Sequence, residues 1–289
     1  MKTSYRDAKE GSYRANANSF YHPVASVIVN CIEKRINFIN RGLFEVKNLQ
    51  SENFTAEKFA ITTETRFLEG FLRDFFYLQK DVSVLVPPLG TSITNAIKVY
   101  SSEKEPKYRL IFKPIDSLNN FAKGFGECGS YFILQSILPE DVKGAKYENV
   151  FSLFYNFKTQ KFLYAEHKGI VYLENKRMKA LHRKSSLTVS INTSAVLSNF
   201  AKPLNLQNAK VKHIFSRSDG IVSDCFDLAN GALDGIVYNQ IKGWELLPIQ
   251  VLLSSLTCYS SLKYNSDFFE NLEKETDLIA GTEVLVKAF

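Results

Sequence analysis

The chain has 289 residues, of which 45% are hydrophobic and 23% charged, a balance that excludes a disordered or low-complexity protein. Its 36 Lys and Arg residues outnumber 30 Asp and Glu residues, and the formal charge of +6 permits an anionic ligand without requiring nucleic acid. The four widely spaced cysteines form no Cys/His cluster, which predicts reduced thiols instead of a zinc site. With no long apolar run and no secretory signal pattern, we expect a cytoplasmic protein that does not enter a membrane.

Two apolar stripes with helical spacing come first along the chain. Behind a helix-opening proline, apolar residues recur every third or fourth position, which predicts one continuous helix over 24–39. A polar link follows over 47–58. A second stripe, rich in Phe over 67–76, predicts a helix that faces the core, with Thr62 or Thr63 as its N-cap.

The middle and the end of the chain contain short β-rich runs separated by turn residues. The runs predict strands at 82–86, 108–112, 130–137, 148–155, 187–192 and 236–239, a hairpin over 161–173, and helices over 216–231 and 245–258. No strand–helix–strand unit repeats, so the pattern favours a layered α+β fold with antiparallel or mixed sheets. We expect a flexible segment over 1–20 and a single domain over 21–289, with two layered halves that meet near 140–185.

Three segments carry a resemblance to a known family. They are KPIDSLNNFAKGF at 113–125, AEHKGIVYLENKR at 165–177, and ANGALDG at 229–235 followed by Trp244-Glu245. Their order and spacing resemble the inositol monophosphatase family, including its bacterial extragenic-suppressor branch. That family carries D-P-[IL]-D-G-T-x-N-F, then A-E-x-G-x-G-A-x-x-N, then G-x-x-D-G and W-D. The resemblance runs from about residue 24 to about residue 258, and it implies the αβαβα fold of inositol monophosphatases and fructose bisphosphatases.

The resemblance also implies a chemistry, the Mg²⁺-dependent hydrolysis of phosphomonoesters such as inositol 1-phosphate. Two or three Mg²⁺ ions held by carboxylates would bind the phosphate, activate water and stabilise the leaving alkoxide. In this sequence Lys113 stands where the family has its first metal-binding Asp. If any metal binds, the ligands that the resemblance leaves are Asp116, Glu245 and the backbone carbonyl of Ile115.

Other positions of the family's site have changed too. The resemblance places Thr65 where the family has an acid linked to water activation, and Pro87 where it has a metal-binding Glu. Leu118 takes the place of a Thr that helps to hold phosphate, so these three positions are expected to be vestigial. The positions expected to line a vestigial pocket, partly filled by bulkier side chains, are Lys113, Ser117 and Tyr238.

The formal charge at the four metal-binding positions shows what these changes mean for activity. Four metal-binding carboxylates have become Asp116, Glu245, Pro87 and Lys113, which takes the formal charge from about −4 to about −1. An ammonium about 4 Å from a divalent ion costs about 8 kcal/mol even at an effective dielectric constant of about 20. We therefore expect a non-catalytic protein with a binding or regulatory role and no cofactor. Lys113 is predicted to replace a metal by pairing with Asp116 and Glu245.

Two other functions stay open. Asp116 and Glu245 could support a residual Mg²⁺-dependent phosphatase acting on inositol or sugar phosphates. The basic run at 176–184 allows a regulator associated with RNA or transcription, and the resemblance to the extragenic-suppressor branch points the same way. Such runs are more often solvated loops, so no nucleic-acid partner is expected. The partners expected are a second copy of the chain, by resemblance, and a phosphorylated small molecule or a protein. Glu245 also has a plainer explanation, because an acid at a helix start is favoured by the helix dipole.

Overall fold

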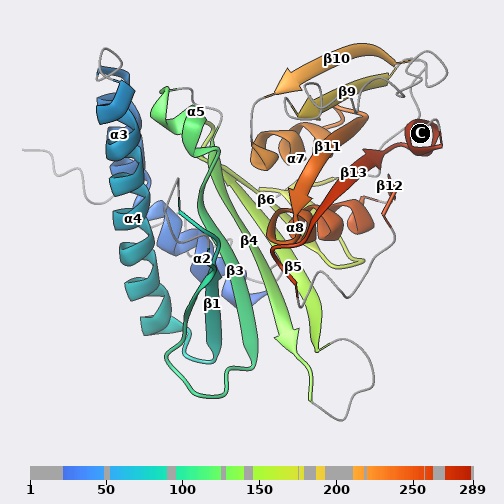
Figure 1. Cartoon of the computed structure of the whole chain (residues 1–289). Coiled ribbons are helices and arrows are strands. Elements are labelled where there is room, and N and C mark those ends of the chain that lie inside the picture. The colour runs from blue at the N-terminus through green and yellow to red at the C-terminus, as the bar shows by residue number, and fades with distance from the viewer. Residues whose placement is uncertain are drawn as a thin grey trace, which may run out of the picture.

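The chain stacks helices and sheets in alternating layers (Figure 1). The computed structural model describes residues 22–48, 53–89, 96–124, 128–139, 146–174, 176–178, 187–192, 211–217, 220–256, 258–262 and 271–287. Among these residues the order of layers is helix, sheet, helix, sheet, helix. This is the layered α+β fold that the sequence predicts. The segment 1–20, predicted to be flexible, lies outside the described residues.

The first sheet has eight strands in the order β2-β1-β3-β4-β5-β6-β7-β8. The strands are β1 (Val82–Val86), β2 (Lys98–Tyr100), β3 (Tyr108–Asp116), β4 (Gly129–Ile137), β5 (Tyr147–Asn156), β6 (Lys161–Glu166), β7 (Val171–Leu173) and β8 (Lys176–Arg177). β1 and β3 run parallel, while the other neighbouring strands are antiparallel. The carboxyl ends of β1 and β3 therefore lie side by side at one end of the sheet.

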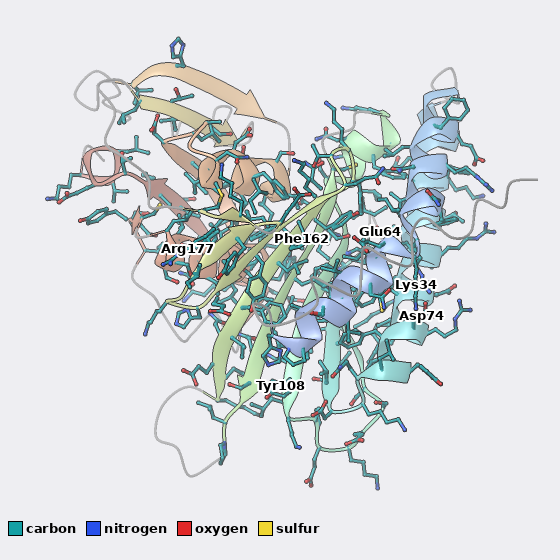
Figure 2. All side chains as sticks on the ribbon, turned by 180° about the vertical axis from the view of Figure 1, so that it is seen from behind. Lys34, Glu64, Asp74, Tyr108, Phe162 and Arg177 are labelled. Carbon is teal, nitrogen blue, oxygen red and sulfur yellow. The ribbon has the colours of Figure 1, made fainter. Side chains whose placement is uncertain are left out.

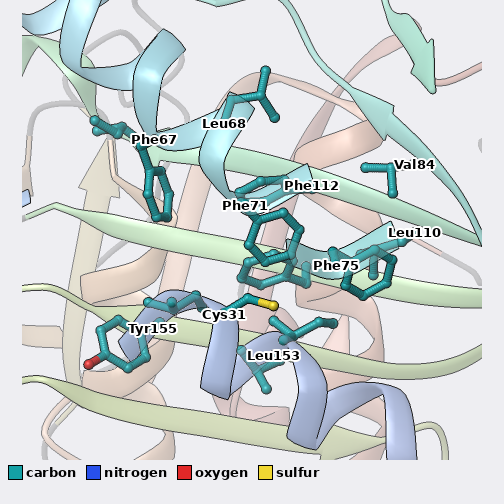
Figure 3. Close-up of a cluster of buried hydrophobic side chains, with 14 of the residues drawn as sticks. Cys31, Phe67, Leu68, Phe71, Phe75, Val84, Leu110, Phe112, Leu153 and Tyr155 are labelled. Atoms are coloured by element: carbon teal, nitrogen blue, oxygen red, sulfur yellow. The ribbon is translucent and has the colours of Figure 1, made fainter. Parts of the chain in front are cut away.

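Three helices cover the outer face of this sheet: α2 (Pro23–Glu33), α3 (Ile36–Asn48) and α4 (Asn53–Leu78). Figure 3 shows Phe71 of α4 against Phe112 of β3, with ring centroids 4.4 Å apart. Phe112 in turn stacks on Phe132 of β4 at 4.4 Å. The Phe stripe is thus core, as its helical spacing predicts.

The start of the chain differs from the prediction in two ways. The predicted single helix breaks after Glu33, where the Arg35 side chain donates to the carbonyl of Cys31 at 3.0 Å and meets Asp74 of α4 at 2.7 Å. The predicted N-cap at Thr62 or Thr63 is wrong, because α4 begins at Asn53. Both threonine hydroxyls instead donate to carbonyls one turn back, a normal way to satisfy hydroxyls inside a helix.

The second sheet has five strands in the order β10-β9-β11-β13-β12. They are β9 (Leu187–Asn192), β10 (Val211–Arg217), β11 (Gly235–Lys242), β12 (Tyr259–Ser260) and β13 (Glu275–Gly281). Helices α7 (Ile221–Ala229) and α8 (Gly243–Ser255) lie between the two sheets, and α10 (Glu283–Val286) packs on the outer face. Because both of its sides are covered, α8 is apolar all round and buries Trp244. The predicted helix over 216–231 is shorter than expected, since its first residues belong to β10.

The cysteines are free thiols with little exposure to solvent. Cys31, Cys128 and Cys225 are buried, Cys258 is partly buried, and all four are free thiols. Burial raises the pKa of each thiol, which makes these cysteines poorly reactive. In the part of the chain that the structure describes, every helix is too short or too polar to span a bilayer.

Candidate functional site

The segment with the strongest resemblance forms the end of β3 and the turn that follows it. Pairing with β4 is irregular here, since Lys113 lies opposite Tyr131 while Asp116 lies opposite Gly129. Ser117 then takes a left-handed conformation, with φ of 61°, and leads into the short helix α5 (Leu118–Ala122). The bulge and the turn bring the side chains of Lys113 and Asp116 to the end of the sheet where β1 also finishes.

Lys113 is held by two elements other than its own strand. Its Nζ donates to the carbonyl of Pro88, just after β1, at 2.9 Å. It also lies 3.7 Å from Oε1 of Glu64 on α4, and that carboxylate is fully buried. Figure 2 labels Glu64 of α4, close to the end of the first sheet from which the chain continues into α5. The prediction that Lys113 pairs with Asp116 and Glu245 is therefore corrected: the ion pair is made with Glu64.

Glu64 also accepts a hydrogen bond from the backbone N–H of Ile115 at 3.3 Å. A buried carboxylate needs both a counter-charge and hydrogen-bond donors, and here β3 supplies both. Sequence reasoning missed Glu64 because the resemblance pointed to its neighbour Thr65. The Thr65 hydroxyl donates to the carbonyl of Ile61 within its own helix, at 2.9 Å.

Asp116 is buried at the base of α7. Its Oδ2 accepts from the backbone N–H of Val222 at 2.9 Å, so the carboxylate sits at a helix N-terminus. Burial raises the pKa of Asp116 to about 7, and the carboxylates of Glu245 and Asp224 push it in the same direction. The Val222 hydrogen bond and the Lys113 charge lower this pKa but do not offset the burial. Near neutral pH a large fraction of this carboxyl therefore keeps its proton.

The other acids of the site are engaged by protein donors as well. Glu245 accepts from the backbone N–H of Lys242 at 3.1 Å, as the acid of a capping box at the start of α8. Asp224 of α7 accepts from the Tyr238 hydroxyl at 2.5 Å. Tyr238, predicted to line a vestigial pocket, is therefore buried against a carboxylate that the sequence analysis did not identify.

Tyr131 on β4 is buried near three of the acids. The side chain is 1% exposed, and its pKa is raised first by burial and then by the carboxylates of Glu245, Asp116 and Glu64. Acids from three elements, α8, β3 and α4, thus lie near the phenol of Tyr131. Tyr131 carried no motif signal, and the only sequence feature that could have marked it is its place at the start of the apolar run YFIL within β4.

The remaining predicted positions offer no acid. Pro87 is buried after β1, and Leu118 of α5 packs against the core formed with the outer helices. Ser117 is buried, and its Oγ makes no hydrogen bond to the other residues that the structure describes. Ile115 is fully buried in its strand.

The residues that are present do not fit a cluster of two or three Mg²⁺ ions. The donor set contains an ammonium, and its carboxylates are directed at N–H and O–H donors of the protein. Within the described ranges, no three His, Cys, Asp or Glu side chains are placed to hold one metal ion. Hard divalent cations need several converging anionic oxygens, and this arrangement does not supply them.

Other predicted features fall outside this site. Lys176 and Arg177, the start of the basic run, are exposed on β8, and residues 179–184 of the run lie outside the described residues. His22 is the N-cap of α2, where its Nδ1 accepts from the N–H of Val24 at 3.3 Å. His22 therefore has a structural role.

Comparisons with known proteins agree with this architecture. No family model and no curated protein matches the sequence. Among solved structures, the extragenic suppressor protein SuhB from Bartonella henselae superposes with a TM-score of 0.68 at 16% identity, covering 92% of this chain and 99% of its own. An extragenic suppressor from Pyrococcus furiosus gives 0.60 at 19% identity, covering 91% and 97%. Inositol monophosphatase-II from Staphylococcus aureus gives 0.60 at 12% identity, covering 87% and 90%.

These matches define the class of fold. The chain has the fold of the inositol monophosphatases, as the three sequence segments predict. More particularly, it resembles the extragenic suppressor proteins of that fold over nearly the whole length of both chains. At these identities the likeness establishes architecture, and activity has to be argued from the site.

Proposed function

We propose that this chain is a non-catalytic protein of the inositol monophosphatase fold that acts by binding. The observation that carries the proposal is the Lys113 ammonium, which lies 3.7 Å from the Glu64 carboxylate and 2.9 Å from the Pro88 carbonyl. This cation stands at the position where the resemblance implies a metal-binding acid. A divalent ion placed there would meet repulsion instead of a ligand.

The means to activate water are also reduced. Thr65 and Leu118 supply no base, and the Asp116 carboxylate accepts a hydrogen bond from the backbone N–H of Val222 at the N-terminus of α7. General-base catalysis needs a deprotonated group within reach of the attacking water, and metal-assisted hydrolysis needs a bound hydroxide. We infer that the chain works without Mg²⁺ and does not turn over phosphomonoesters.

Binding remains a reasonable role for the retained fold. Similar structures have been solved with inositol monophosphate or 2′-AMP bound to the staphylococcal protein. A phosphorylated small molecule is therefore our first candidate ligand, with a protein partner or a second copy of the chain as the alternatives. The free thiols fit a cytoplasmic location. We also infer that residues 21–289 act as one domain, because α7 and α8 form a shared core between the sheets.

The test is phosphate release from inositol 1-phosphate and related phosphomonoesters, with and without Mg²⁺. Folded protein, verified by circular dichroism, should release no phosphate above background, while the staphylococcal inositol monophosphatase serves as the positive control. Calorimetric titration of inositol 1-phosphate in EDTA then asks whether the chain binds the ligand without metal. Mg²⁺-dependent release that disappears in Asp116→Asn would contradict the proposal.

One observation favours a second candidate, a residual Mg²⁺-dependent phosphatase. Glu64 is an acid near this site that the sequence comparison did not identify, although it is paired with Lys113 and no three of the described acids are placed to hold one metal ion. The same assay separates the two functions, because only the phosphatase requires Mg²⁺ and loses activity when Asp116 is neutralised.

A further inference from the structure

Lys113 joins three elements that are distant in the sequence. Its backbone belongs to β3, its hydrogen-bond acceptor follows β1, and its ion-pair partner Glu64 lies on α4. The Lys113 side chain is 17% exposed and that of Glu64 is fully buried, so solvent screens this pair poorly. The Lys113 ammonium thus lies at the end of the first sheet where β1 and β3 both finish.

The surroundings of this ammonium are acidic. Glu64, Asp116 and Glu245 all raise the pKa of Tyr131, which lies opposite Lys113 on the neighbouring strand. Lys113 lowers the pKa of Asp116, against the effects of Glu245 and Asp224. The geometric basis of this charge balance is the ion pair with Glu64, whose fully buried carboxylate lies 3.7 Å from the Lys113 ammonium.

We propose that the Lys113 ammonium is a built-in cation that performs the charge-balancing role of a metal ion and makes the folded state independent of divalent ions. The inference concerns the same site as the proposed function, but it rests on the stability of the fold and requires no statement about activity. It makes two demands. Divalent ions should leave the native protein unchanged, and removal of the ammonium should destabilise the folded state, because the buried Glu64 carboxylate loses its ion-pair partner.

The first experiment compares melting temperatures in EDTA and in millimolar Mg²⁺ or Ca²⁺. The unmodified protein should melt at the same temperature in all three conditions, since a ligand raises stability only if the folded state binds it. Lys113→Met keeps much of the side-chain length and removes the charge. It should lower the melting temperature by about 5 °C or more, because it leaves Glu64 buried without its counter-charge. Divalent ions should not restore that loss, because no three of the described acids are placed to hold one metal ion.

A second variant keeps the test decisive if Lys113→Met does not fold. In Lys113→Met/Glu64→Gln both charges are absent, so the double variant should melt above Lys113→Met in EDTA and should not respond to divalent ions. The matched control is Lys161→Met, which removes a Lys–Glu pair of similar length, 3.6 Å, whose side chains are both nearly half exposed. That control should change the melting temperature by no more than about 1 °C.

Three results would overturn the inference. The first is stabilisation of the unmodified protein by Mg²⁺ that EDTA reverses. The second is a Lys113→Met protein as stable as the Lys161→Met control. The third is a double variant no more stable than Lys113→Met. None of these readouts measures phosphate release, so a failure here is distinguishable from a failure of the proposed function.

Discussion

Replacing Asp116 by Asn tests whether this buried carboxyl opposes folding at neutral pH. The pKa of Asp116 is raised from 3.8 to about 7, chiefly by burial. Between those two pH values the folded protein holds a proton that the unfolded chain has released. Stability therefore falls as the pH rises from about 4 to about 7, and above that range both states are ionised and the loss is complete.

The size of the effect follows from the shift. Three pKa units at about 1.4 kcal/mol each give about 4 kcal/mol as the upper limit of the difference between acid and neutral pH. Asp116→Asn removes the titration and keeps a side-chain oxygen to accept from Val222. We expect the variant to match the parent protein near pH 4 and to exceed its free energy of unfolding by up to about 4 kcal/mol at pH 8.

Urea denaturation of both proteins at pH values between 4 and 8.5 measures this difference. Asp74→Asn is the control with the opposite sign, because the hydrogen bond from Arg35 is the leading cause of a lowered Asp74 pKa. The stability that Asp74 contributes is present above its unfolded pKa and is lost as the pH falls. A difference between Asp116→Asn and the parent that stays constant across the pH range would refute the reasoning.

Three further predictions concern packing and the turn. Phe71→Ala should lower the free energy of unfolding, measured in urea, by about 3–5 kcal/mol, because Phe71 is fully buried against Phe112 and Phe132. The control is Tyr77→Ala, at a residue that is 84% exposed, which should change the free energy of unfolding by less than about 0.5 kcal/mol. Ser117→Gly should raise the melting temperature by a few degrees, since it removes about 1 kcal/mol of left-handed backbone strain. A lower melting temperature would show instead that the Ser117 side chain stabilises the fold. Tyr238→Phe should cost about 2 kcal/mol in the same urea titration by removing the donor to the buried Asp224 carboxylate, and an unchanged midpoint would contradict that role.

Local sequence pattern was sufficient where a run is apolar, short and bounded by turn residues. The predicted strands 82–86 and 187–192 match the bounds of β1 and β9. β13 was missed because polar residues make up its first half, so its sequence alternates too weakly to be read as a strand. The break between α2 and α3 was also missed, because the apolar period continues across it. The contact between Arg35 and Asp74 forms only once α4 has packed against the first helices.

At the site, the motifs located the end of β3 but not the partners of its side chains. The resemblance pointed to Thr65, while the structure uses Glu64. Adjacent helix residues differ by about 100° around the axis, so a shift of one residue decides which side chain faces the sheet. Tyr131 and Asp224 lie in segments without a motif, and they join the site through strand pairing and through the position of α7.

The sequence by itself determined the chemical inventory of this protein. It specified the layered α+β class, the Phe-rich core helix, and a lysine in place of an acid at position 113, because residue identity and periodicity are properties of the chain alone. Only the tertiary structure decided that Lys113 meets Glu64 and the Pro88 carbonyl. The pKa of Asp116 was likewise set by burial beneath α7. Ion pairs and desolvation depend on distances across layers, and these distances exist only after helices and strands from separate parts of the chain have packed together.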